Sequence, residues 1–167
     1  MALQRTGHVA IRVRDLEAAK RFYGDVLGMK LGMEIPGQGL FFRFNDYHHD
    51  LAVFKAREGA EPASKNHAGI AHIALVADDF ATVLAMYQRL LAHGVAVSRT
   101  IDHGATKSIY FSDPDGIELE IYCEVPEFDW RRNGMVRVPM DIEKDGAARP
   151  ISPEQARGAS VPLPSDP

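Results

Sequence analysis

Residues 103–122 read H-G-A-T-K-S-I-Y-F-S-D-P-D-G-I-E-L-E-I-Y and carry the strongest fold signal in the chain. A strand rich in β-branched and aromatic residues is expected over 108–111, and Pro114 and Gly116 mark the turn that follows it. A second, alternating strand comes after the turn. The stretch therefore predicts a β-hairpin.

The outgoing strand of this hairpin has two chemically different faces, because strand side chains alternate in direction. Its apolar face holds Ile117, Leu119 and Ile121, and its other face holds Glu118, Glu120 and Tyr122. Exposure to solvent is the simpler interpretation of Glu118. Glu120 gains a role only if other parts of the chain supply it with partners.

The chain repeats one pattern of elements. Residues 7–32 predict a short strand and then a helix with Asp15 at its N-cap, and residues 71–97 predict the same with an Asp78/Asp79 cap and Gly94 as the helix stop. Apolar positions recur in both helices at helical spacing and are expected to face the core. They are Leu16, Ala19, Phe22, Tyr23, Val26 and Leu27 in the first helix, and Phe80, Val83, Leu84, Tyr87, Leu90 and Leu91 in the second.

Three strand-like segments follow each helix, so each half is β-α-β-β-β. The expected strands are 29–34, 40–44 and 50–55 in the first half, and 95–100, 108–112 and 117–124 in the second. A linker rich in Gly, Ala, Pro and Ser joins the halves over 56–64. Since an open sheet face needs cover, we expect an α+β fold in which two βαβββ modules form a cupped sheet around a shared cavity.

Composition argues against several classes of protein. The 167 residues carry a net charge of −4 without a Lys/Arg-rich run, which argues against nucleic-acid binding. No window is long and apolar enough to span a membrane and the N-terminus lacks a signal pattern, so we expect a cytoplasmic protein with no membrane partner. The single cysteine, Cys123, is expected to be a small core residue.

Two histidines occupy matching places in the repeat. His8 and His72 each stand near the start of the first strand of their module, so the repeat would bring them to equivalent points around the cavity. For any single one of the seven histidines, a surface or core role is the simpler interpretation. Together with Glu120, however, the matched pair makes a set of two histidines and one carboxylate.

The repeat, its two opening histidines and the run from D-H-G-A-T-K to E-L-E-I-Y resemble the vicinal oxygen chelate superfamily, and within it the type I extradiol ring-cleaving dioxygenases. The resemblance covers about residues 5–124. It implies one vicinal oxygen chelate domain over 1–125, with module 1 at about 5–56 and module 2 at about 68–124, followed by a C-terminal extension or tail over 126–167.

The resemblance also implies the site residues. The metal ligands fall on His8, His72 and Glu120, and the catalytic residues on His49, Tyr110 and His103. In this assignment His49, of H-H-D-L-A-V-F, accepts and donates protons beside the metal, while strand alternation sends His48 the other way. Tyr110 and His103 would hydrogen-bond the substrate hydroxylates.

The implied activity is insertion of O2 into a catechol-type aromatic diol at non-haem Fe(II). Mn(II) is the alternative metal, because both ions accept N/O ligand sets of this kind. Further copies of the chain are expected partners, since many ring-cleaving relatives have four modules and this chain has two. The sequence does not select one catechol; apolar candidates at the mouth of the cavity are Phe42, Phe44, Phe54 and Trp130.

Other functions within the superfamily remain open. They are a fosfomycin-resistance-type thiol transferase, a glyoxalase- or epimerase-like metalloenzyme, and a metal-free, bleomycin-resistance-like binding module. Glyoxalase-type relatives take a further ligand from the first module, where the position that we align with Glu120 is Ala52.

The segment 125–167 lacks the repeat periodicity, and its last part predicts a flexible tail. Phe128 and Trp130 are candidates to anchor this extension over the pocket or onto a partner subunit. His67 and His93 are expected to be structural.

Overall fold

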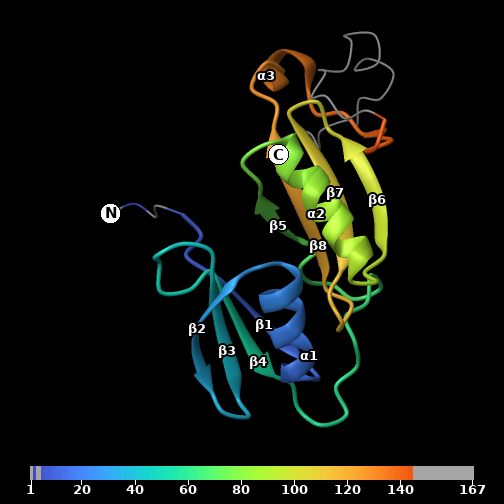
Figure 1. Ribbon diagram of the computed structural model, residues 1–167. Coiled ribbons are helices and arrows are strands. Elements are labelled where there is room, and N and C mark those ends of the chain that lie inside the picture. The colour runs from blue at the N-terminus through green and yellow to red at the C-terminus, as the bar shows by residue number, and fades with distance from the viewer. Residues whose placement is uncertain (1, 3–4, 145–167) are drawn as a thin grey trace. The chain divides into compact units, whose positions relative to one another are not determined.

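The computed structural model describes residues 2 and 5–144, which divide between two compact units (Figure 1). Unit 1 is Met1–Ala68 with the turn Asp113–Ile117, and unit 2 is Gly69–Ser112 with Glu118–Pro167. Each unit has its own sheet and its own helix, so the chain has the repeated α+β architecture expected from the sequence. The cupping of the two modules into one domain over 1–125 stays a prediction.

Unit 1 contains a four-stranded sheet in the order β1-β4-β3-β2. Its strands are β1 (Val9–Val13), β2 (Lys30–Ile35), β3 (Gly39–Arg43) and β4 (Leu51–Lys55). The strands β1 and β4 are parallel, and the other pairs are antiparallel. Between β1 and β2 the helix α1 (Leu16–Lys20) continues directly into a π-helical turn, η1 (Arg21–Val26), and this helix lies along one face of the sheet (Figure 1).

Local chemistry explains these elements. Asp15 caps α1 as expected, because its carboxylate accepts the backbone N–H groups of Glu17 and Ala18 at 2.9 and 3.1 Å. The alternating residues of β1 bury Ile11 and Val13 against the helix. The other buried apolar residues of unit 1 are Ala19, Phe22, Tyr23, Val26, Leu27, Met29, Leu40, Phe42, Leu51, Ala52 and Val53.

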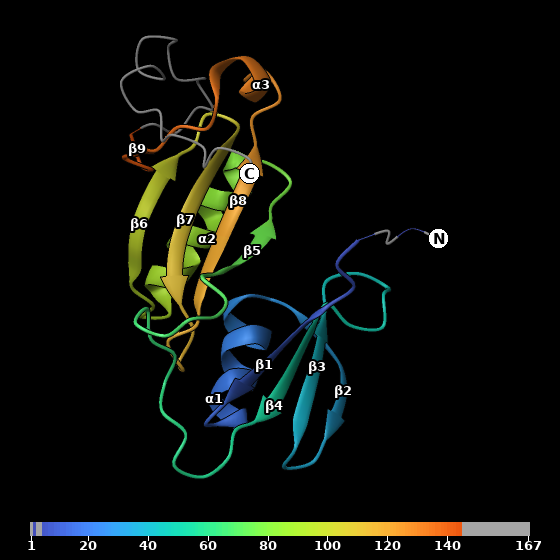
Figure 2. The same cartoon turned by 180° about the vertical axis from the view of Figure 1, so that it is seen from behind.

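Unit 2 repeats the pattern and adds one strand. It consists of β5 (Ile73–Val76), α2 (Phe80–Ala92), β6 (Val97–Asp102), β7 (Thr106–Ser112), β8 (Glu118–Glu124), the short helix α3 (Trp130–Asn133) and β9 (Val138–Pro139). The sheet order is β5-β8-β7-β6-β9, and α2 lies across one face while β9 extends the edge beside β6 (Figure 2). The hairpin predicted over 103–122 is the pair β7 and β8.

The core of unit 2 lies between α2 and its sheet. Leu119 and Ile121 of β8 are buried there, as the alternation predicted, and Cys123 is buried beside them at 1% exposure. Burial raises the pKa of the Cys123 thiol, which keeps it protonated as a core residue. Gly94 ends the helix with φ of 72°, as expected for a C-terminal stop.

Three expectations about burial are wrong. Leu91 is 47% exposed, because its neighbour Leu90 is the one that faces the sheet and successive helical residues point about 100° apart. Phe42 is fully buried against Tyr23, so it does not line the mouth of a cavity. Glu118 is not left to solvent, since Arg99 binds its carboxylate.

The C-terminal extension is described as far as residue 144, and the predicted flexible tail lies outside the described residues. Among the described residues, no helix has the length and apolar character needed to cross a membrane.

Candidate functional site

The open face of the unit 2 sheet brings together four of the six predicted site residues. His72 stands directly before β5, and Glu120 lies at the centre of the neighbouring parallel strand β8. The His72 Nε2 atom is 3.0 Å from the Glu120 Oε2 atom. The Glu120 side chain is 10% exposed and that of His72 is 36% exposed, so the pair lies at the boundary between sheet and solvent.

Tyr110 and His103 extend this pair into a chain of polar contacts. Tyr110 faces Glu120 across the β7–β8 ladder and donates its hydroxyl hydrogen to Oε1 at 2.8 Å. His103, in the turn between β6 and β7, has its Nε2 atom 2.9 Å from the Tyr110 hydroxyl. Glu120 therefore meets a histidine on one oxygen and a phenol on the other.

Burial and the contact with Glu120 set the protonation of Tyr110. Removal from solvent, then the hydrogen bond to Glu120 and the charge of that carboxylate, raise the pKa of Tyr110 to about 12. The nearby Arg99 opposes this shift. Tyr110 is therefore a neutral hydroxyl, able to donate one hydrogen bond, at any physiological pH.

Arg99 is a neighbour of the site that sequence reasoning missed. Its guanidinium lies 3.9 Å from the centre of the Tyr110 ring and binds Glu118 through two N–H groups at 2.9 and 2.8 Å. A bidentate contact of this kind fixes the plane of the guanidinium. The signal was present in the sequence only as the spacing of Glu118 and Glu120 on one strand face.

The other two predicted site residues meet in unit 1. His8 stands directly before β1, in the place that His72 has before β5, and its ring centre is 4.4 Å from that of His49. His49 lies in the turn before β4 and also contacts Phe41, with ring centres 5.2 Å apart. Phe41, rather than the buried Phe42, is thus the aromatic side chain beside His49.

Strand alternation predicts that His48 points away from His49, and this prediction is wrong. The two residues precede β4, where alternation does not apply, and their Nδ1 atoms are 2.6 Å apart. One of the two nitrogens must carry hydrogen for this contact to be a hydrogen bond. Desolvation, with His48 and His8 nearby, lowers the pKa of His49, which favours its neutral, proton-accepting form.

The register of the two sheets supports the internal alignment. Ala10 and Ala74 each lie two residues after the opening histidine of their module. Ala10 pairs with Ala52 in unit 1, and Ala74 pairs with Glu120 in unit 2. Ala52 is therefore the unit 1 counterpart of Glu120. The first module therefore has a histidine, His8, that corresponds to His72, but it has no carboxylate that corresponds to Glu120.

The donor set of unit 2 fits two ligand positions of a divalent metal ion. Two ligand atoms that each lie about 2.0–2.2 Å from one ion, at a right angle, are about 3 Å apart, which is the separation of His72 Nε2 and Glu120 Oε2. Within residues 2 and 5–144, no group of three or more His, Cys, Asp or Glu residues is placed to hold a metal ion. His8 belongs to the other unit, so the three-ligand set stays a prediction.

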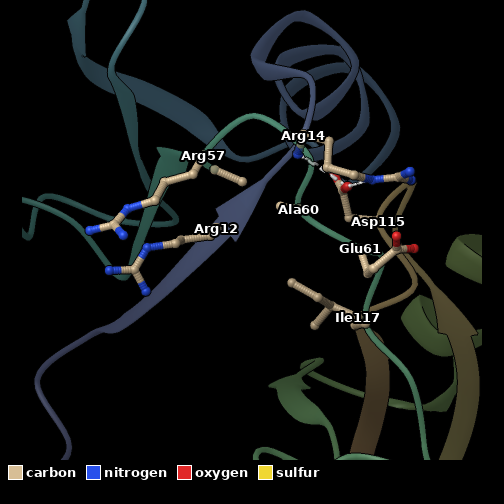
Figure 3. A pocket seen from close by; sticks show the side chains of 9 residues that line it. Arg12, Arg14, Arg57, Ala60, Glu61, Asp115 and Ile117 are labelled. Carbon is tan, nitrogen blue, oxygen red and sulfur yellow. Dashed lines mark hydrogen bonds and ion pairs between the residues drawn. The ribbon is translucent and has the colours of Figure 1, made fainter.

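Unit 1 also contains a pocket of about 460 Å³ that the sequence did not predict. Arg14 turns toward Asp115, whose carboxylate accepts its Nε–H at 2.6 Å and its backbone N–H at 3.1 Å, whereas Arg12 and Arg57 point away from this pair (Figure 3). No described carboxylate forms an ion pair with Arg12 or Arg57. The pocket wall is completed by Ala56, Ala60, Glu61, Ala63 and Ile117.

Comparisons with known proteins agree with this architecture. The family model described as "Glyoxalase/Bleomycin resistance protein/Dioxygenase superfamily" matches residues 5–121. Biphenyl-2,3-diol 1,2-dioxygenase 2 of Rhodococcus globerulus is 34% identical over 123 residues, which are 72% of this chain and 64% of that protein. Catechol-2,3-dioxygenase of Bacillus subtilis is 27% identical over 82% of this chain and 49% of that protein. The chain thus spans less than two thirds of either relative.

Solved structures show the same fold. A lactoylglutathione lyase from Agrobacterium tumefaciens superposes with a TM-score of 0.59 at 27% identity, covering 74% of this chain and 96% of that one. A glyoxylase/bleomycin resistance protein/dioxygenase domain from Frankia sp. EAN1pec gives a TM-score of 0.65 at 20% identity, covering 74% of this chain and all of that one. With two βαβββ modules and a family match over residues 5–121, the chain belongs to the glyoxalase/bleomycin resistance protein/dioxygenase, or vicinal oxygen chelate, superfamily.

Proposed function

We propose that this protein is an extradiol ring-cleaving dioxygenase that inserts O2 into a catechol-type aromatic diol at a non-haem Fe(II). The observation that carries the proposal is the contact of His72 with Glu120, backed by Tyr110 and His103 on one face of the unit 2 sheet. The names of the relatives from Rhodococcus globerulus and Bacillus subtilis support the same reaction class.

In this proposal His72 and Glu120 hold the metal, and His8 is the third protein ligand. Two neutral imidazoles and one carboxylate suit Fe(II) and also accept Mn(II). When bound, the iron would bring the diol and O2 together and pass electron density from one to the other. A cytoplasmic homo-oligomer is also part of the proposal.

The chain's own residues would manage protons and position the diol. His49, whose lowered pKa favours the neutral imidazole, would accept a proton from the diol and return it to the product. Tyr110 keeps its hydroxyl hydrogen, so it could donate a hydrogen bond to an oxygen of the substrate in exchange for its bond to Glu120. Phe41 and Phe54, with ring centres 5.7 Å apart, give His49 an apolar neighbourhood suited to an aromatic ring.

A glyoxalase-type activity is less well supported, despite the structural likeness to a lactoylglutathione lyase. The unit 1 position equivalent to Glu120 is Ala52, which is 2% exposed and has no ligand atom in its side chain. The first module therefore lacks the additional ligand that such relatives take from it.

The test is to load the purified protein with Fe(II) without oxygen, and then to add catechol or 2,3-dihydroxybiphenyl in air. We expect a yellow ring-opened product and matching oxygen uptake, both lost in His72→Ala. His93→Ala is the matched control, since His93 is an exposed residue at the end of α2.

Each other outcome points to a different function. Iron binding without oxygen uptake on any diol would contradict ring cleavage and favour another metalloenzyme of the superfamily. Failure to bind any divalent metal would favour a metal-free binding module.

A further inference from the structure

The C-terminal segment Val125–Met140 folds back onto the turn that carries His103. The strand β9 pairs with β6 in the register Ile101 with Pro139 and Asp102 with Val138. Backbone bonds continue this contact on both sides, from Met140 N–H to the Thr100 carbonyl at 3.0 Å and from Val136 N–H to the His103 carbonyl at 3.2 Å. The segment is therefore part of the unit 2 sheet.

An apolar cluster fixes the same segment from the other side of the turn. Phe128 and Val136 are buried with Ala105 and Val125. The Phe128 ring occupies the space that a side chain at position 104 would need, because a Cβ atom there would lie 2.5 Å from the ring. Gly104 also has φ of 78°, which side-chain-bearing residues rarely adopt. The lack of a side chain at Gly104, directly after His103, thus leaves room for the Phe128 ring.

The same segment also contacts the His103 ring. The Nδ1 atom of His103 is 2.9 Å from the carbonyl oxygen of Val136. A carbonyl oxygen can only accept a hydrogen bond, so Nδ1 carries the hydrogen. Consequently the other ring nitrogen, Nε2, is the one that faces Tyr110.

The position of Nε2 matters because Tyr110 has a single hydroxyl hydrogen. With Nδ1 carrying the hydrogen of the neutral ring, Nε2 is an acceptor, so Nε2 and Glu120 Oε1 compete for the single Tyr110 hydrogen. If the ring instead carried its hydrogen on Nε2, that N–H would donate to the phenol oxygen and leave the Tyr110 hydrogen to Glu120 alone. The orientation of Nε2 toward Tyr110 therefore influences whether the Tyr110 hydroxyl donates to Glu120 or to His103.

We propose that Val125–Met140 is a positioning element of the site, in which the Val136 carbonyl, held by β9 and by Phe128 against Gly104, keeps His103 protonated at Nδ1 with Nε2 directed at Tyr110. Positioning residues of this kind act through a neighbour and touch no substrate. The effect on catalysis rests on the proposed function, whereas the state of the His103 ring does not.

The first readout is the tautomer of His103, measured by nitrogen-detected NMR on the ¹⁵N-labelled full chain. We expect hydrogen on Nδ1 in the unaltered protein and loss of this fixed state in Phe128→Ala. The atoms of Phe128 nearest position 104 are those at the far end of its ring, and Phe128→Met, whose apolar side chain is long enough to reach there, should restore it in part. Trp130→Ala is the matched control, since Trp130 lies in the same segment and is 49% exposed.

The second readout is steady-state kinetics of diol cleavage. Phe128→Ala should lower kcat about 10-fold with little change in KM, as expected for loss of an outer-sphere partner. A folded Phe128→Ala protein with an unchanged His103 tautomer would overturn the proposal. If the unaltered protein cleaves no diol, the proposed function fails, but the tautomer measurement still decides this one.

A second variant covers the case in which Phe128→Ala does not fold. Thr100→Val keeps the side-chain shape and removes only the hydrogen bond from the Thr100 hydroxyl to the Met140 carbonyl. It should weaken the attachment of β9 and loosen the His103 tautomer in a folded protein. An unchanged tautomer in Thr100→Val, where hydrogen exchange shows β9 released, would also overturn the proposal.

Discussion

The His72 Nε2 atom lies 3.0 Å from Glu120 Oε2, and the parallel register of β5 and β8 maintains this contact. Ile73 pairs with Leu119, so His72 and Glu120 both project from the sheet face opposite α2. A shift of β8 by one residue would send Glu120 to the helix side and Leu119 to solvent. Burial of Leu119 and Ile121 against α2 is therefore what keeps the carboxylate beside the histidine.

Replacing Glu120 by Gln should abolish tight metal binding. The amide keeps the size of the side chain but removes the negative charge that a divalent ion needs, so affinity for Fe(II) should fall by more than the roughly 10- to 100-fold typical of outer-sphere changes. Anaerobic Fe(II) titration measures this. Glu124→Gln, an exposed change on the same strand, should bind as the unaltered protein does. Equal affinity in Glu120→Gln would contradict the assignment of Glu120.

How far the sequence predicts this site depends on whether the signal is local. The β7–β8 hairpin follows from a local pattern, and the structure confirms it. The matching places of the opening histidines and the equivalence of Ala52 with Glu120 follow from the repeat, and the registers of the two sheets confirm them. The three-ligand set draws on both modules and therefore stays a prediction.

The features that were missed depend on contacts between distant segments. No period in the sequence marks β9, because it is only two residues long and is held by bonds to β6. The same holds for Arg99, whose contacts with Tyr110 and Glu118 appear only once β6, β7 and β8 are paired. The alternation of strand side chains does not extend to His48, because His48 lies in the turn before β4.

Tyr23→Phe should destabilise the protein through Asp113. The Tyr23 hydroxyl donates to Asp113 Oδ2 at 2.8 Å, while Oδ1 accepts the backbone N–H groups of Asp115 and Ile117. Loss of a buried hydrogen bond to a charged group costs about 1.5–3 kcal/mol of unfolding free energy. Urea unfolding measures it, with Tyr87→Phe in α2 as a control expected to change little. A cost near zero for Tyr23→Phe would mean that water replaces the hydroxyl.

Asp113 should also give the stability a pH dependence of defined sign. Burial raises the pKa of Asp113 above its usual 3.8, against the opposing effect of its hydrogen bonds. The folded protein then binds this proton more tightly than the unfolded chain does, so stability falls as pH rises from 3.8 through the folded-state pKa and is level above it. The lowered pKa values of Asp15, Asp79 and Asp141 act in the opposite direction. The fall due to Asp113 is therefore measured as the difference in urea unfolding between the unaltered protein and Asp113→Asn across this range.

The ion pair of Lys107 with Asp102 should respond asymmetrically to mutation. Both side chains are almost fully buried, with Nζ and Oδ2 2.5 Å apart, and Oδ1 accepts the Gly104 N–H. Lys107→Met leaves a buried charge without its partner and should cost about 3–5 kcal/mol. Combining it with Asp102→Asn should recover part of this loss, because the charge is removed while an oxygen remains for Gly104. Additive losses in urea unfolding would show that the two residues do not interact.

Arg99→Gln should raise the pKa of Tyr110 further. A cation 3.9 Å from the ring centre stabilises the phenolate, and its charge is among the influences that lower this pKa, whereas burial and Glu120 raise it to about 12. Without Arg99 the ultraviolet titration of Tyr110 in the metal-free protein should move to higher pH, identified by subtracting the titration of a Tyr110→Phe variant. Arg99→Lys keeps the positive charge but loses the bidentate hydrogen bonds to Glu118, so it should shift the titration of Tyr110 less than Arg99→Gln does. An unchanged titration in Arg99→Gln would mean that Arg99 serves Glu118 alone, and that Tyr110 owes its protonation only to burial and to Glu120.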